Sequence, residues 1–258
     1  MLKTVNGIIN YSSPKLEALP GLVHAFLGRT GGVSSGHLAS LNLGRREEDR
    51  PENLVDNKKR IAQAFEIVPE RLFTISQVHS DRIVVIDRPD VTPEDIKAQE
   101  ADGIITNVTG ISIGILTADC VPVLLYDSKK KIIAAVHAGW KGTASKIAVK
   151  AVDIMVERFE CRLLDITAAI GPAIGLCCYE VGEEVVAAVG YRDKAAVRRD
   201  GKWRLDLPKA NLLQLQEAGV TEVDISDICT SCRTDLFFSH RGEKGKTGRQ
   251  LSFISLGV

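Results

Sequence analysis

The sequence predicts an α+β fold with a mixed or antiparallel sheet. Between residues 82 and 137, short segments rich in β-branched residues follow one another with only turns between them. A doubly wound parallel sheet would need crossover helices in this stretch. Residues 111–116 and 132–136 are apolar on both faces, which is typical of strands that are buried on two sides. We therefore expect a sheet stacked between a second sheet and a layer of helices.

The predicted strands are short and are bounded by turn residues. In chain order they are residues 82–87, 101–106, 111–116, 122–126, 132–137, 166–170 and 222–225.

Helices separate only some of these strands. Residues 51–65 and 144–159 carry apolar side chains at helical spacing, and Thr143 is the expected N-cap of the second helix. A third helix is expected over residues 209–218, because Pro208 suits a first helical position and a glycine follows the segment.

Composition indicates a globular protein. The chain has 258 residues, 45% of them hydrophobic, with no repeat or Pro/Ser-rich linker, so a single domain over residues 1–258 is expected. Lys+Arg and Asp+Glu are both 33, which leaves no net charge to attract nucleic acid or an anionic membrane. No apolar run approaches the roughly 20 residues that span a bilayer, and the first residues lack a signal segment. A cytoplasmic location is expected, with the six cysteines mostly reduced.

Three residues beside apolar runs form a candidate metal site. His79 precedes a predicted strand, Cys120 lies in a turn between two strands, and His137 ends a strand. Two imidazoles and one thiolate suit Zn²⁺ or copper, and three protein ligands leave a fourth position for water or substrate. The alternative is that each is a structural residue.

Motifs along nearly the whole chain resemble the YfiH, or laccase-domain, family. They are H-A-F at 24–26, R-T-G-G-V-S at 29–34, S-L-N-L-G at 40–44, Q-V-H-S at 77–80, A-D-G at 101–103, T-A-D-C-V-P at 117–122, H-A-G-W-K-G at 137–142, I-G-P at 170–172, C-C-Y-E-V at 177–181, S-H-R at 239–241 and T-G-R at 247–249. The resemblance implies a four-layer α/β/β/α sandwich with mixed sheets and a zinc site at His79, Cys120 and His137.

Members of that family have been called polyphenol oxidases and, alternatively, purine nucleoside phosphorylases that also deaminate adenosine. The implied substrates are phosphate and adenosine, inosine, guanosine or methylthioadenosine. The preferred nucleoside and the oligomeric state are left open by the sequence.

The histidine count argues against a multicopper oxidase. Such an enzyme needs many imidazoles in H-x-H pairs, and this chain has five histidines and no such pair. A single blue-copper site needs a weak axial ligand, for which Met1 and Met155 are poorly placed. Zinc is therefore the favoured metal, with copper as the alternative.

Phosphorolysis needs donors for phosphate and for the nucleoside. Arg29 and Arg241 are candidate phosphate ligands because a guanidinium matches phosphate bidentately, and Arg241 follows an apolar run, 236–238, interpreted as a strand. Asn42 and Gln77 are candidate nucleoside ligands, although Asn42 is equally suited to capping its own turn. Asp119 is a candidate proton relay and Arg249 is interpreted as a surface residue.

The remaining cysteines are interpreted as buried thiols. Cys229 and Cys232 form a C-x-x-C motif, but a structural zinc needs a second pair, and adjacent Cys177 and Cys178 are awkward joint ligands. A Cys–His hydrolase using Cys120 and His137 remains an alternative function. In that mechanism His79 has no role, so the zinc hypothesis is favoured.

Overall fold

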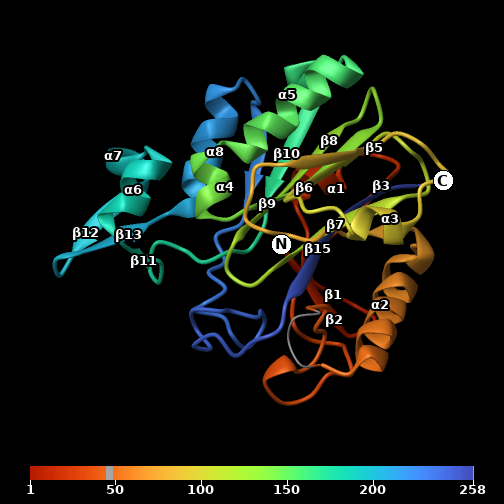
Figure 1. The fold of residues 1–258 in the computed structure, drawn as a ribbon, viewed down its shortest axis with the longest axis horizontal. Helices are drawn as coiled ribbons and strands as arrows, with labels where there is room; N and C mark the ends of the chain where they lie inside the picture. The colour runs from red at the N-terminus through yellow and green to blue at the C-terminus, as the bar shows by residue number, and fades with distance from the viewer. Residues whose placement is uncertain (45–48, 258) are drawn as a thin grey trace.

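In the computed structural model, which describes residues 1–44 and 49–257, two six-stranded sheets stack on one another (Figure 1). The first has the order β1 (Leu2–Val5), β2 (Ile8–Tyr11), β3 (Leu22–Leu27), β15 (Gln250–Leu256), β7 (Ser112–Thr117), β4 (Leu72–Phe73). The second has the order β14 (Glu222–Ile225), β10 (Ile166–Ile170), β8 (Val121–Asp127), β9 (Ile132–Ala138), β6 (Gly103–Thr106), β5 (Ile83–Ile86). Both sheets are mixed, because β4 with β7, β5 with β6 and β10 with β14 pair in parallel whereas the other neighbours are antiparallel.

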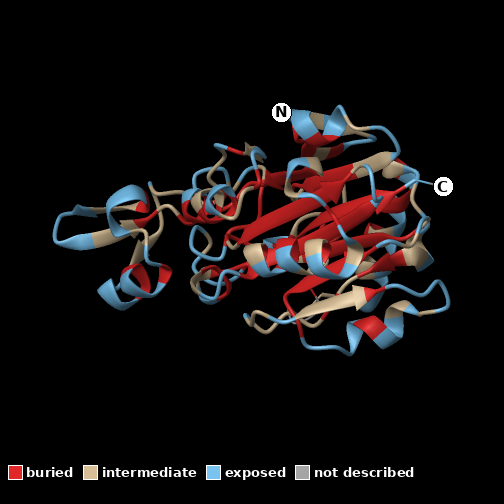
Figure 2. Ribbon diagram, turned by 90° about the horizontal axis from the view of Figure 1, so that it is seen from above, coloured by how far each residue is buried: buried red, intermediate tan, exposed pale blue. Residues whose placement is uncertain are grey.

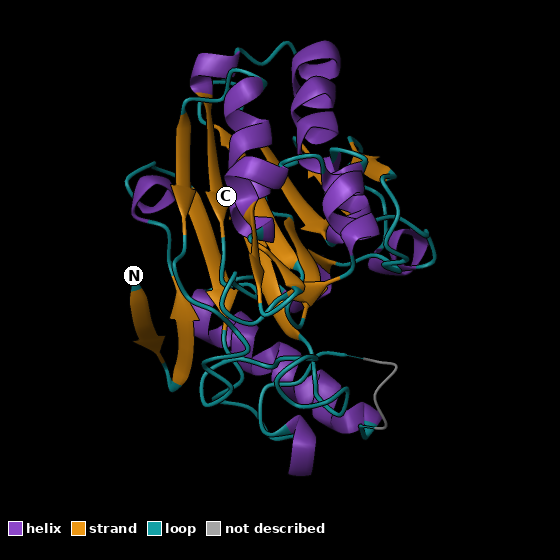
Figure 3. Ribbon diagram, turned by 90° about the vertical axis from the view of Figure 1, so that its left-hand side faces the viewer, coloured by secondary structure: helices purple, strands orange, loops and turns teal. Residues whose placement is uncertain are grey.

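Helices cover the outer face of each sheet, as Figure 3 shows. Helix α2 (Pro51–Phe65) packs on the first sheet, where its Ile61 shares a core with Phe253 of β15. Helices α5 (Ile147–Phe159) and α8 (Leu207–Glu217) pack on the second sheet. The resulting order of layers is helix, sheet, sheet, helix, as the sequence resemblance implies.

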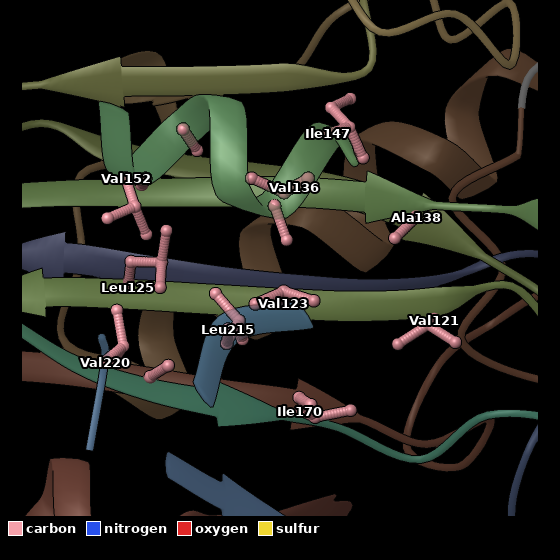
Figure 4. Packing of buried hydrophobic residues seen from close by; sticks show 14 of the residues in the cluster. Val121, Val123, Leu125, Val136, Ala138, Ile147, Val152, Ile170, Leu215 and Val220 are labelled. Carbon is pink, nitrogen blue, oxygen red and sulfur yellow. The ribbon is translucent and has the colours of Figure 1, made fainter. Parts of the chain in front are cut away.

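Strand β8 explains why central strands are apolar on both faces. Its Val123 and Leu125 point toward α5 and α8, into the core drawn in Figure 4. Its Leu124 and Tyr126 belong to a second core, shared with Ile254 of the facing sheet. Figure 2 shows the resulting band of buried strands between more exposed helices. Alternating side chains of one strand thus stabilise two separate interfaces.

A smaller three-stranded sheet projects from this body (Figure 1). It has the order β11 (Glu180–Val181), β13 (Lys202–Leu205), β12 (Ala196–Arg199), and it packs with α6 (Glu183–Val189) and α7 (Arg192–Ala195). Two further short helices are α1 (Pro14–Glu17) and α3 (Pro93–Lys97). No described helix has the length and apolarity needed to cross a bilayer.

The predicted strands and the helix over 51–65 are confirmed, with ends that shift by one or two residues at most. The helix predicted over 144–159 is wrong at its start. Lys146 adopts a left-handed conformation with φ +56° and divides the segment into α4 (Trp140–Ala144) and α5. Thr143 therefore lies inside α4 and is not an N-cap; its Oγ1 accepts a hydrogen bond from Asn211 of α8. The strand predicted at 236–238 is a turn instead.

Candidate active site

His79, Cys120 and His137 come together where both sheets end. His79 lies in the loop between β4 and β5, Cys120 directly precedes β8, and His137 lies in β9 opposite Pro122 of β8. Their ligand atoms lie within 4.8 Å of one another, and the Cys120 Sγ to His79 Nε2 distance is 3.9 Å. His79 is held at φ +59°, an uncommon conformation for a residue other than glycine. Tertiary contacts therefore impose this loop shape.

Asp102, just before β6, supplies those contacts. Its Oδ1 accepts hydrogen bonds from His79 N at 3.1 Å and His137 Nδ1 at 2.8 Å. Its Oδ2 accepts from Ser80 N at 2.6 Å, Ser80 Oγ at 2.8 Å and Val78 N at 3.3 Å. One buried carboxylate thus positions the His79 loop and the His137 ring together.

The site is strongly polarised. Burial alone would raise the pKa of Asp102, but the hydrogen bonds from His137 and Ser80 outweigh it and lower that pKa to about 2. Burial likewise disfavours charge on Cys120, yet the neighbouring His137 lowers the thiol pKa to about 6. Against burial, the Cys120 thiolate and Asp102 raise the pKa of His137 to about 9. His137 therefore favours the thiolate form of Cys120, and Cys120 and Asp102 favour the protonated form of His137.

The three donors fit a metal ion. Because Asp102 accepts from His137 Nδ1, the ring's Nε2 is the nitrogen available for ligation. Gly139 leaves room for the cluster: a Cβ there would lie 3.1 Å from His79 Cδ2 and 3.2 Å from Cys120 Sγ. Two imidazoles and one thiolate whose ligand atoms lie within 4.8 Å of one another match a three-ligand metal site with an open fourth position.

The donors open into a cavity of about 480 Å³, a size suited to a small-molecule ligand. Its lining includes the basic side chains of Lys97, Arg241 and Arg249, together with His240. Tyr179 adds an aromatic surface. The cavity thus combines metal donors, positive charge and a ring on which a flat ligand can stack.

Arg241 is placed by two neighbours. Its guanidinium lies 5.6 Å from the centre of the Tyr179 ring and donates to the carbonyl of Glu180 at 3.0 Å. Its backbone N–H donates to Asp119 Oδ2 at 2.6 Å. Asp119 also accepts from the hydroxyls of Thr230 and Ser239, both at 2.7 Å. These bonds give Asp119 a structural role, which argues against the predicted proton relay.

The other predicted ligands are placed differently from expectation. Arg29 is outside the cavity lining; its guanidinium bonds the carbonyls of Ala39 and Thr234 and pairs with Glu243 at 2.8 Å. The guanidinium is thus engaged in a structural network. This disfavours the predicted contact with phosphate, which stays a prediction.

Asn42 is also outside the lining. Its Oδ1 accepts from Gly44 N and Arg249 N, both at 2.9 Å, so it caps its own turn and positions two residues that do line the cavity. Gln77 does line the cavity, but its amide bonds the backbone N–H and carbonyl of Leu116. Arg249, interpreted from sequence as a surface residue, lines the cavity.

Several site residues were missed by the sequence reasoning. Asp102 carried one signal, an acidic residue next to an apolar strand, but its two histidine contacts are over 20 residues away in the chain. Tyr179 stands in the C-C-Y-E-V motif but was assigned no role, and Lys97 gave no signal, because a lysine is an ordinary surface residue until the fold places it. The interpretation of Cys177, Cys178, Cys229 and Cys232 as buried thiols is wrong. Cys177 and Cys232 are exposed, the other two are half-buried, and all four form one cluster.

Comparison with known proteins agrees with this geometry. Residues 23–257 match the family model described as multi-copper polyphenol oxidoreductase laccase. The chain belongs to this laccase-like family. A relative from Deinococcus radiodurans, named purine nucleoside phosphorylase, is 38% identical over 98% of this chain and 95% of its own length. A Geobacillus stearothermophilus relative named purine nucleoside phosphorylase YlmD is 36% identical over 91% of this chain and 90% of its own.

Solved structures of this laccase-like family share the fold. The crystal structure of YlmD from Geobacillus stearothermophilus superposes with a TM-score of 0.90 at 34% identity, covering 99% of this chain and 98% of that one. The Bacillus licheniformis protein YfiH gives a TM-score of 0.91 at 33% identity over the same shares of the two chains. The family assignment therefore holds over the whole four-layer body.

Proposed function

We propose that this laccase-like protein is a zinc-dependent purine nucleoside phosphorylase that acts on adenosine, inosine, guanosine and methylthioadenosine. The observation that carries this proposal is the cavity itself, whose lining holds the donors of His79, Cys120 and His137 together with basic side chains. The names of its relatives support the same reaction. In phosphorolysis, phosphate attacks the anomeric carbon of ribose as the glycosidic bond breaks, so the site must hold a dianion beside a departing purine.

His79, Cys120 and His137 would hold the zinc, which when bound supplies Lewis acidity toward a ligand oxygen. Arg241 offers a guanidinium to the phosphate, and Arg249 and Lys97 add positive charge to the cavity lining. Tyr179 offers its ring to the purine. No protein nucleophile is required for this chemistry.

Adenosine deamination is proposed as a second reaction at the same site, with water as the nucleophile in place of phosphate. We also propose a cytoplasmic location, where the six thiols stay reduced.

The decisive experiment incubates untagged protein with adenosine, with and without phosphate, and identifies the products by chromatography. Adenine and ribose 1-phosphate that depend on phosphate support phosphorolysis, whereas inosine formed without phosphate supports deamination. If neither set of products forms with metal-loaded protein, the proposed function is wrong.

A Cys–His hydrolase is the second candidate, favoured by one observation. Asp102, His137 and Cys120 form a row in which the carboxylate orients the imidazole and the imidazole lowers the thiol pKa to about 6, as in cysteine hydrolases. The two candidates differ in His79. Replacing His79 with Ala should remove zinc and phosphorolysis together, whereas a hydrolase with metal-independent turnover would retain activity.

Copper is the alternative metal, and its fit is poorer. Met155 lies on the buried face of α5, in the core, and offers no axial ligand. Elemental analysis of protein expressed with both metals available discriminates zinc from copper directly.

A further inference from the structure

Of the five cysteines outside the candidate active site, four come from two loops that leave the same end of the second sheet. Cys177 and Cys178 follow β10, and Cys229 and Cys232 follow β14, which pairs with β10 in parallel. The pairing continues beyond the strands, because Thr230 N donates to the carbonyl of Ala173 at 3.0 Å. Residues more than 50 positions apart in the chain are therefore held side by side.

The local backbone brings all four thiols toward one another. In an extended strand, adjacent Cys177 and Cys178 would point to opposite faces. They instead lie in a tight turn, where the N–H groups of Cys178 and Tyr179 both donate to the carbonyl of Gly175 at 3.0 Å. The C-x-x-C segment is also wound, because Arg233 N donates to the carbonyl of Cys229 at 3.1 Å. This geometry removes the objection that adjacent cysteines cannot act as joint ligands.

The distances between sulfurs match a single tetrahedral ion. All four Sγ atoms lie within 4.8 Å of one another, with Cys232 Sγ at 3.5 Å from Cys177 Sγ and 3.4 Å from Cys178 Sγ. A zinc–sulfur bond of about 2.3 Å puts tetrahedral ligands about 3.8 Å apart. A disulfide would need about 2.05 Å. An iron–sulfur cluster places several atoms between the thiolates and would hold them further apart.

The surroundings suit a thiolate site. Gly175 N donates to Cys229 Sγ at 3.2 Å, a bond that stabilises a thiolate ligand. A Cβ on Gly175 would lie only 3.3 Å from Cys229 Cβ, a tight contact, and 3.5 Å from Cys177 Sγ, so glycine fits best where this backbone lies against the two cysteines. Arg204 donates to the carbonyl of Cys177, which brings a cation beside a group that is anionic when metal is bound.

We propose that Cys177, Cys178, Cys229 and Cys232 bind a second divalent metal ion of the zinc class, in a closed four-thiolate site that has a structural role. The site would join the two loops that build one wall of the cavity. Tyr179 directly follows the first cysteine pair. Thr230, inside the second pair, bonds Asp119, which in turn holds the backbone of Arg241.

The first test is metal stoichiometry in untagged, full-length protein, purified with reductant, saturated with ZnCl₂ and desalted. We expect about two zinc ions per chain in the wild type, and about one after either Cys120→Ala or the double change Cys229→Ser, Cys232→Ser. Cys161→Ala is the matched control, because that thiol is buried in the core away from both sites and its loss should leave two. One zinc or less in the wild type, unchanged by the double change, would overturn the proposal.

A second measurement keeps the cluster intact and so does not depend on how its variants fold. Cobalt(II) added to Cys120→Ala protein should show a thiolate-to-metal charge-transfer band, about four times as intense per ion as in a site with one thiolate. Absence of that band would contradict a metal site. A disulfide between these cysteines that persists in the presence of reductant would also contradict it. Neither readout uses nucleoside turnover, so this inference fails or stands separately from the proposed function.

Discussion

Asp102→Asn should weaken metal binding at the candidate active site although Asp102 is not itself a ligand. The carboxylate accepts five hydrogen bonds and donates none. An asparagine keeps the shape but replaces one acceptor oxygen with an NH₂ group. If that NH₂ faces His137 Nδ1, the ring proton moves to Nε2, which is the nitrogen needed for the metal. If the NH₂ group faces Ser80, two donors meet, and the hydrogen bond from Ser80 N is lost.

Either orientation of the asparagine amide should lower the affinity for metal. Loss of a carboxylate that orients a ligating histidine lowers metal affinity by about 10- to 100-fold. This corresponds to roughly 1.4 to 2.8 kcal/mol. Because His79, Cys120 and His137 are all still present, the metal should still bind, but with a larger dissociation constant.

The assay is competition for zinc with a chromophoric chelator, in protein whose four-cysteine cluster is already loaded. Asp127→Asn is the matched control: that buried carboxylate accepts from the backbone of Lys129 and Lys130 in a turn and does not line the cavity. Urea unfolding of both variants verifies that they fold. If folded Asp102→Asn protein binds zinc within twofold of the wild type, the role assigned to Asp102 is refuted.

Three further predictions follow from single contacts. Burial lowers the pKa of His24 from 6.5 to about 4, and its Nε2 accepts a hydrogen bond from Ser13 N. Between pH 6.5 and 4, His24 is therefore protonated in the unfolded chain but neutral in the folded one. Stability should therefore fall by about 2 kcal/mol between pH 7.5 and 5, and urea unfolding of His24→Gln should lack this component. Gly139→Ala should weaken metal binding several-fold without backbone strain, since φ is −66°; zinc affinity equal to that of the wild type would contradict the tight fit. Arg241→Ala should raise the phosphate concentration for half-maximal rate by roughly tenfold or more, whereas Arg29→Ala should leave it unchanged and lower the free energy of unfolding by about 1–3 kcal/mol. The reverse result in initial-rate assays would reassign the phosphate ligand.

Local patterns predicted much of the scaffold correctly. The apolar segments of the central sheet and the amphipathic helix over 51–65 depend on burial and spacing, which the sequence states directly. The break at Lys146 was not predictable, because a lysine in a left-handed conformation leaves no sequence signal and is held there by the packing of α4 and α5. Strand β15 was missed although it lies in the centre of the first sheet, between β3 and β7.

By itself, the sequence determined which residue types could ligate a metal and beside which strands they stand, because ligand chemistry and hydrophobic period are local properties. Only the tertiary structure decided which side chains meet. It brought Asp102 to both histidines, turned Arg29 toward Glu243 instead of the cavity, and gathered four cysteines from two loops. Each of these outcomes depends on parallel or antiparallel strand pairing between distant segments, and no local sequence pattern encodes which strands become neighbours.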